Sequence, residues 1–191
     1  MRVNKFAERL TRVYHRLTVK TQPINFLSSV DDYRDCLVCL PANMEFILEA
    51  ASKLPHIAEI FPNRMINVLL TSNIDPRSHN YIKRFTIIKP YSSDINSFYL
   101  PKRSFINRVA AQGISVCIDL DFNPNFFNSS VCIMTKAPVR IGFAKGLGLP
   151  YYNLEIDIDS DKVSTKESYN QFIKVLYNFK NEGEEIAPIK T

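Results

Sequence analysis

The chain has 191 residues, of which 46% are hydrophobic and 23% charged, a composition typical of a folded domain rather than a disordered chain. The length suits one domain, or one domain with an extension, and no apolar run approaches the ~20 residues that a membrane-spanning helix needs. The net charge of +5 arises entirely in residues 1–20, which hold six Lys and Arg against one Glu, while the rest of the chain carries 18 of each sign.

Residues 1–20 predict a basic amphipathic helix. Five apolar residues recur at spacings of three and four, which places them along one stripe: Val3, Phe6, Leu10, Val13 and Leu17. Residues 21–34 then predict a connector, because Pro23 interrupts the periodicity. We therefore divide the chain into this helix with its connector, residues 1–34, and a single domain over residues 35–191.

The basic helix has three interpretations. Its apolar stripe could pack on the domain or on a second copy of the chain, which would make a homo-oligomer, with the arginines flanking the contact. It could instead lie on an anionic membrane surface through residues 1–20. Nucleic acid is the third partner, and the one we favour least, because the neutral remainder of the chain offers no further basic path. We favour packing on protein.

The first half of the domain predicts three buried strands and one helix. The expected strands, all short apolar runs, are residues 35–41, 65–72 and 84–90. After the first strand, Asn43 suits the N-cap of a helix that continues to about Leu54. Pro55 is expected to end that helix, because proline disfavours the helical conformation of the residue before it.

The second half continues the alternation of helices and strands. In order, the expected elements are a helix at 101–111, a strand at 114–121, a helix at 124–136, a strand at 138–143, a short edge strand at 151–158 and a final helix. Gly113 suits the left-handed position that ends the first of these helices, and Ser164 with Glu167 forms a capping-box pattern for the last. Strands that are apolar throughout and alternate with helices predict an α/β fold: a Rossmann-like, doubly wound, mainly parallel sheet with helices on both faces.

Two acidic residues end the expected strand at residues 114–121. Asp119 and Asp121 lie on the same side of that strand, at the carboxyl edge where open α/β sheets bind ligands. A pair of carboxylates there suits Mg²⁺. The alternative, which we favour, is that one caps the following helix and the other accepts hydrogen bonds from loop amides. Asn123 lies in the same place and has the same two interpretations.

The cysteines and histidines predict no metal site. Cys36 and Cys39 are three residues apart in an expected strand, so their side chains should point to opposite faces. We expect buried, reduced thiols of the kind found in cytoplasmic proteins. The three histidines are scattered along the chain without the spacing of metal ligands. We therefore expect neither a metal nor a cofactor.

Three segments of the second half carry a resemblance to a known family. They are CIDLDFNPNFF (117–127), MTKAPVRIGF (134–143) and YYNLEI (151–156). An aspartate-bearing strand, a helix and then an arginine-isoleucine-glycine strand are similar to the N-terminal domain of the heptosyltransferase-type enzymes, glycosyltransferase family 9. Residues 37–72 match the same domain in layout. The resemblance covers Asp35 to Asn181 and implies one Rossmann-like half of a two-domain GT-B glycosyltransferase.

The same resemblance implies where an acceptor sugar and a catalytic base would lie. In the catalytic members, the loop after the first strand has a Ser-Leu-Gly-Asp type sequence, whose aspartate is the proposed general base. Here that loop is Pro41-Ala42-Asn43-Met44-Glu45, which makes Glu45 the candidate base in an altered loop. The implied substrate-binding residues are Asn43, Asp119, Asp121, Asn123 and Arg140. For Arg140 two roles are equally favoured, contact with the acceptor cleft and an ion pair with a carboxylate such as Asp119.

The resemblance also bears on function. GT-B enzymes bind the nucleotide-sugar donor mainly through a C-terminal domain, and this sequence stops at Thr191. We therefore expect a binding or scaffold module, a pseudoenzyme that is not catalytically competent alone. The alternative is the acceptor-side half of a split or truncated glycosyltransferase of lipopolysaccharide or cell-surface glycan synthesis, with a separate donor-binding chain as its partner. The charged N-terminus has no secretory-signal pattern, so we expect a cytoplasmic protein or one peripheral at the inner membrane.

Overall fold

The protein folds around one parallel β-sheet. The computed structural model describes residues 5–19, 35–158 and 163–186. Six strands pair in the order β3-β2-β1-β4-β5-β6, every pair parallel. Their bounds are β1 Asp35–Cys39, β2 Ile66–Leu69, β3 Thr86–Ile88, β4 Ile114–Asp119, β5 Val139–Phe143 and β6 Leu154–Ile156. This is the strand order of the doubly wound Rossmann fold, which confirms the predicted fold class.

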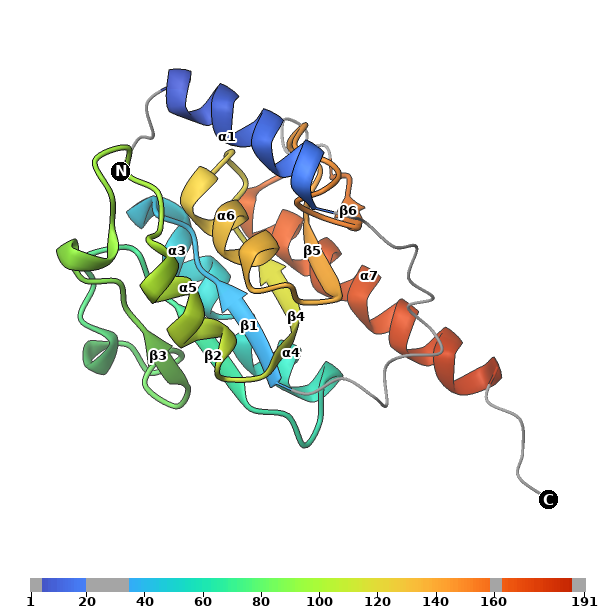
Figure 1. Cartoon of the computed structure of the whole chain (residues 1–191). Coiled ribbons are helices and arrows are strands. Elements are labelled where there is room, and N and C mark those ends of the chain that lie inside the picture. Colours follow the sequence, from blue (N-terminus) through green and yellow to red (C-terminus); the bar gives the residue numbers. More distant parts are fainter. Residues whose placement is uncertain (1–4, 20–34, 159–162, 187–191) are drawn as a thin grey trace.

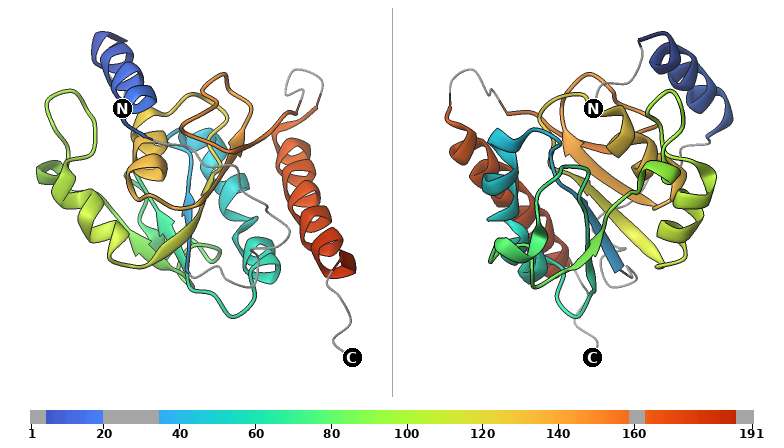
Figure 2. Two further views of the ribbon diagram at one scale, coloured as in Figure 1. Left: turned by 45° about the vertical axis from the view of Figure 1, so that its right-hand side comes forward. Right: turned by 90° about the vertical axis from the view of Figure 1, so that its left-hand side faces the viewer.

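Helices cover both faces of the sheet. One face carries α3 (Met44–Ala51), α4 (Leu54–Ile60) and α7 (Thr165–Ile186), and the opposite face carries α5 (Arg103–Ala110) and α6 (Phe126–Met134) (Figures 1 and 2). Two short 3₁₀ helices, at Pro76–Ser78 and Ser92–Asp94, lie in the connections beside β3. The sheet is therefore buried on both sides, which is why its strands are apolar throughout rather than alternating.

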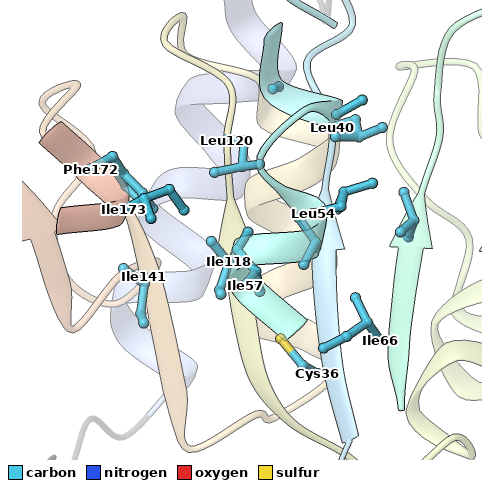
Figure 3. Packing of buried hydrophobic residues seen from close by; sticks show 14 of the residues in the cluster. Cys36, Leu40, Leu54, Ile57, Ile66, Ile118, Leu120, Ile141, Phe172 and Ile173 are labelled. Atoms are coloured by element: carbon cyan, nitrogen blue, oxygen red, sulfur yellow. The ribbon is translucent and has the colours of Figure 1, made fainter. Parts of the chain in front are cut away.

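The core forms two hydrophobic clusters that the sheet separates. Figure 3 shows one of them, where Ile118 and Ile141 of the sheet lie beside Ile57 of α4 and Phe172 of α7. Cys36 belongs to this cluster, whereas Cys39 belongs to the cluster on the other face. The four cysteines are buried free thiols. The prediction that Cys36 and Cys39 point to opposite faces is confirmed, because successive strand residues alternate in direction.

The boundaries of the helices and strands follow the local sequence, with three corrections. Asn43 caps α3 as predicted, but α3 ends at Ala51 and Pro55 lies in the first turn of α4 instead of terminating a longer helix. Proline is favoured there because the first helical N–H groups have no intrahelical partner. β4 ends at Asp119, so Asp121 lies beyond the strand. The helix predicted from Pro124 begins at Phe126, because Asn125 is its N-cap.

The predicted basic helix is present as α1 (Lys5–Thr18), and it lies beside α6 (Figure 1). Its contact with the domain is made by His15, which is 3% exposed, and by Arg12, whose guanidinium lies 5.7 Å from the centre of the Phe126 ring. The described part of the apolar stripe faces the other way, with Leu10, Val13 and Leu17 all more than half exposed. The expectation that the stripe packs on the protein's own domain is therefore wrong. The predicted connector, residues 21–34, lies outside the described residues.

No described helix is both long and apolar enough to cross a bilayer. The longest, α7, has charged residues in nearly every turn.

Candidate functional site

The carboxyl ends of β1 and β4 form the topological switch point of the sheet. These two strands are neighbours, yet the chain leaves β1 toward α3 on one face and leaves β4 toward α6 on the other. In open α/β sheets the ligand crevice lies where such connections diverge. Asn43 lies in the loop after β1, and Glu45 follows in the first turn of α3. Asp119 ends β4, and Asp121 and Asn123 lie in the loop after it, so five of the predicted site residues lie at this edge.

Asp119, the last residue of β4, is completely buried and accepts four hydrogen bonds. Its Oδ2 receives the Nζ of Lys145 at 2.7 Å and the hydroxyl of Tyr152 at 2.5 Å. Its Oδ1 receives the backbone N–H of Asp121 at 3.1 Å and the side-chain amide of Asn128 at 3.3 Å. An ionised carboxylate has about four acceptor positions. Asp119 therefore has no position left for a metal ion or a substrate hydroxyl.

The ion pair of Asp119 is made with Lys145 and not with Arg140. In the β4–β5 register, Asp119 stands opposite Gly142, while Arg140 stands opposite Cys117, two residues further back. At Gly142 a Cβ would lie 3.0 Å from the Tyr152 ring, so glycine gives that ring the space from which its hydroxyl reaches Asp119. Lys145 follows β5 and bonds both Asp119 and the backbone oxygen of Asp121. The alternative that Arg140 pairs with Asp119 is thereby corrected.

Tyr152 acts in this network as a donor that keeps its proton. Burial, and then the charge of Asp119, raises the pKa of the Tyr152 hydroxyl well above its usual value. Its oxygen also lies 2.7 Å from the hydroxyl of Ser129 in α6. The hydroxyl thus joins the loop before β6 to β4 and α6 at the strand ends, a structural role that needs no ligand.

Asp121 fastens the two loops of the switch point to each other. Its Oδ2 accepts the backbone N–H of Ala42 at 3.2 Å and the side-chain amide of Asn125 at 3.0 Å, and its Oδ1 accepts the N–H of Asn123 at 3.1 Å. Burial, and then the nearby Asp119, raises the pKa of Asp121 above its usual value. The Phe46 and Phe122 rings, 5.7 Å apart, reinforce the same junction.

These contacts agree with the interpretation that Asp119 and Asp121 hold local structure together, except in one detail. The helix cap is Asn125, whose side chain accepts the N–H groups of Phe127 and Asn128, and neither aspartate caps α6. Over residues 5–19, 35–158 and 163–186, no group of three or more His, Cys, Asp or Glu side chains is arranged to hold a metal ion. The paired carboxylates therefore hold loops together instead of forming an open Mg²⁺ site.

Three predicted residues remain exposed at the edge. Asn43 uses its side-chain oxygen to accept the N–H of Glu45 at 3.1 Å, and the Glu45 carboxylate is exposed in the first turn of α3. Asn123 is also exposed, on the loop after β4. The Asp121–Ala42 hydrogen bond ties these loops together, so Asn43, Glu45 and Asn123 share one surface over the switch point. Their roles in substrate binding and catalysis stay predictions.

Arg140 lies elsewhere. It is the second residue of β5, and its side chain points to the α5–α6 face, where its Nε donates to the Tyr151 carbonyl at 3.0 Å and its Nη1 to the Ala137 carbonyl at 2.5 Å. The structure therefore does not bring it to the surface over the switch point.

Sequence reasoning missed four members of the strand-end network. Asn125 carried a signal, because an asparagine before the apolar run FFNSSVCIM suits an N-cap. Asn128, Lys145 and Tyr152 carried none, since their partners lie 9, 26 and 33 residues away along the chain.

Comparison with known proteins identifies solved structures with a similar fold. No protein-family model and no curated protein sequence matches the chain. Among solved structures, it is similar to E. coli ADP-heptose LPS heptosyltransferase II, with a TM-score of 0.56 and 14% identity over 75% of this chain and 40% of that one. It is also similar to a glycosyl transferase of family 9 from Veillonella parvula, with a TM-score of 0.53 and 14% identity over 75% and 41% of the two chains. The chain thus spans about two fifths of their length. The likeness shows that the chain has the fold of one half of such an enzyme, as the resemblance implied.

Proposed function

We propose that this chain is an acceptor-side domain of glycosyltransferase type that binds a glycan at the surface over the switch point and does not transfer sugar by itself. The observation that carries the proposal is that the two carboxylates at the end of β4 are buried and already bonded by other groups of the protein. Asp119 and Asp121 are buried and accept seven hydrogen bonds between them. A general base must lie within hydrogen-bond reach of the hydroxyl that it deprotonates, and neither carboxylate can offer that contact. Glu45 is exposed at this edge, but it follows a loop that differs from the Ser-Leu-Gly-Asp type loop of the catalytic members.

The surface above this network suits binding. Asn43 and Asn123 present exposed amide side chains on two loops that the Asp121–Ala42 hydrogen bond holds together. Amides both donate and accept hydrogen bonds, which matches the hydroxyl groups of a sugar. Because these loops are already held in place, they lose little conformational entropy when a ligand binds to them.

The binding proposal is tested by nuclear magnetic resonance. A ¹⁵N-labelled sample is titrated with a lipopolysaccharide core oligosaccharide, and we expect amide shifts at residues 42–46, 121–123 and 125. The double variant Asn43→Ser with Asn123→Ala should lose them, since serine keeps the helix cap of α3 while both amide side chains are removed. The matched control is Asn178→Ala, another exposed asparagine, on α7 and outside the pockets that the described residues form. Absence of shifts in the wild type, or equal shifts in the double variant, would contradict the proposal.

A second candidate function is the acceptor-side half of an active transferase that works with a donor-binding chain. It is favoured by Glu45, an exposed carboxylate at the end of the loop where the heptosyltransferase-type enzymes carry their base. If this candidate is correct, the chain together with that partner transfers sugar, and Glu45→Gln abolishes the transfer. Glu49→Gln, one turn further along α3, is the matched control and should leave the rate unchanged.

A further inference from the structure

A pocket of about 750 Å³ lies between the C-terminal half of α1, the helices α5 and α6 and the start of β5. This volume falls in the range of small-ligand sites. Three cationic side chains line it, Arg103, Lys136 and Arg140, and Ile106 and Ile133 give it an apolar part. Among the described residues, the lining contains no aspartate or glutamate. The pocket is therefore positively charged and partly apolar.

Arg140 is the buried member of this set, with only 7% of its surface exposed. Its side chain donates hydrogen bonds to the backbone carbonyls of Tyr151 and Ala137, which are neutral acceptors. The ion pairs within the described residues join Arg12 to Glu8, Arg108 to Asp94 and Lys145 to Asp119, and none includes Arg140. No carboxylate of the residues that the structure describes thus balances the buried guanidinium of Arg140.

Such a charge is costly, because arginine cannot lose its proton at physiological pH and burial removes its hydration. Two carbonyls hold the guanidinium in one orientation but do not neutralise it. An anion in the pocket would balance the charge, and a planar guanidinium matches the oxygens of phosphate and carboxylate groups. The exposed Arg103 and Lys136 add to the same positive field without blocking access.

We propose that this pocket binds an organic phosphate. Its phosphate group would contact Arg140 at the inner end and Arg103 and Lys136 at the rim, while its apolar body would lie against Ile106 and Ile133. The site is separate from the surface over the switch point, because Arg140 lies at the amino half of β5 and the loops of that surface leave from the carboxyl ends. The inference therefore stands whether or not the proposed function is correct.

The N-terminal helix forms one wall of the site. Tyr14, His15 and Thr18 of α1 line the pocket together with residues of α5 and β5. A ligand that touches both α1 and the domain stabilises their docking by mass action. Binding should therefore slow hydrogen exchange in α1 as well as raise the melting temperature of the domain.

Calorimetric titration at low ionic strength tests the proposal with three probes: inorganic phosphate, phenyl phosphate and dihexanoyl phosphatidate. We expect at least one organic probe to bind about tenfold or more tightly than inorganic phosphate, since only the organic probes can bury apolar surface. Tighter binding of phenyl phosphate indicates a soluble metabolite and tighter binding of the phosphatidate a lipid headgroup, and either result supports the site. If neither organic probe binds more tightly than inorganic phosphate, the proposal is overturned.

Paired variants locate the binding. Arg103→Gln with Lys136→Gln should weaken the organic probe about tenfold, because two charge-assisted contacts at the rim are lost. The control is Lys83→Gln with Arg84→Gln, an equal change of charge at two exposed residues outside the pocket. In the wild type, the Nε–Hε resonance of Arg140 should also move on binding, a readout that needs no variant at the buried position. Equal weakening in both pairs, or an unmoved Arg140 resonance, would overturn the assignment.

Discussion

At the scale of single residues, Asp119 and Lys145 form a pair whose members are both nearly inaccessible to solvent and lie 2.7 Å apart. A buried ion pair contributes modestly when intact, yet removal of one partner leaves an unbalanced charge. Asp119 also receives the Tyr152 hydroxyl and two further donors, so a whole strand end depends on it. We therefore assign Asp119 a role in the stability of the fold and not in catalysis.

Asp119→Asn should therefore destabilise the protein by about 3–5 kcal/mol, since Lys145 is left buried without its counter-ion. Urea denaturation followed by circular dichroism measures the loss. Adding Lys145→Met should recover part of it, because the second change removes the unbalanced charge. A cost of less than about 1 kcal/mol for the single variant would mean that the pair contributes little.

Tyr152→Phe tests the neutral part of the same network. The variant keeps the ring against Gly142 and removes only the hydroxyl that Asp119 and Ser129 share. We expect a cost of about 1–3 kcal/mol in the free energy of unfolding, the range for leaving buried partners unsatisfied. Tyr91→Phe is the control, because that ring is 70% exposed, and it should cost less than about 0.5 kcal/mol.

At the scale of elements, the docking of α1 depends on one titratable side chain. His15 is buried, its Nδ1 lies 3.2 Å from the Tyr151 hydroxyl, and burial lowers the pKa of His15. The docked helix thus binds fewer protons than the undocked one as pH falls below about 6.5. Docking should weaken on acidification and be complete above that pH. Arg12, which also faces the domain, cannot titrate in this range.

Hydrogen exchange of residues 5–19 between pH 7.5 and 5.5, corrected for intrinsic rates, measures this effect. We expect protection of the α1 amides to fall at the lower pH in the wild type. His15→Gln has no titrating ring and should show the same protection at both values. Protection that falls equally in both proteins would assign the pH dependence to another group.

The face of α1 that points away from the domain exposes apolar and basic side chains. Leu10, Val13 and Leu17 are exposed, Leu17 by 81%, and Arg9 and Arg16 are exposed beside them. We propose that this face lies on an anionic membrane surface. Two copies of the helix packed through the same face would bring like charges together, whereas anionic lipid matches both the arginines and the apolar stripe.

Vesicle co-sedimentation tests this contact. The wild type should bind vesicles that contain about 30% phosphatidylserine and lose binding at high salt, because screening weakens the attraction. Leu10→Ser with Leu17→Ser should abolish binding, while Met65→Ser with Tyr81→Ser, two exposed apolar residues elsewhere, should not. If the wild type is instead a dimer by light scattering and ignores vesicles, the face is a contact between copies.

At the scale of the whole molecule, local patterns predicted the layers of the fold but not the contacts between distant residues. The apolar strands, the Asn43 cap and the opposite directions of Cys36 and Cys39 follow from periodicity and capping, which act over a few residues. The pairing of Asp119 with Lys145 could not be predicted, since it depends on the β4–β5 register. The hydrogen bond from Tyr152 to Asp119 depends in addition on the space at Gly142.

The orientation of α1 was predicted wrongly for a similar reason. Its apolar stripe was expected to pack on the domain or on a second copy, and the structure does not place it on the domain. The docked face is mixed, with His15 against Tyr151 and Arg12 over Phe126, and Val19, just after the helix, packs against the core of the α5–α6 side. Periodicity identifies an amphipathic helix and cannot say which surface its apolar stripe meets. That choice depends on rings supplied by distant parts of the chain.

We propose that a domain with the fold of half a glycosyltransferase, whose strand-end carboxylates are occupied by structural hydrogen bonds, does not transfer sugar by itself. The most direct test incubates the purified chain with ADP-heptose and a lipopolysaccharide core acceptor and follows the acceptor by mass spectrometry. We predict no gain of a heptose unit, with the wild type indistinguishable from a reaction without protein. Addition of heptose by this chain alone would contradict the proposal that it does not transfer sugar by itself.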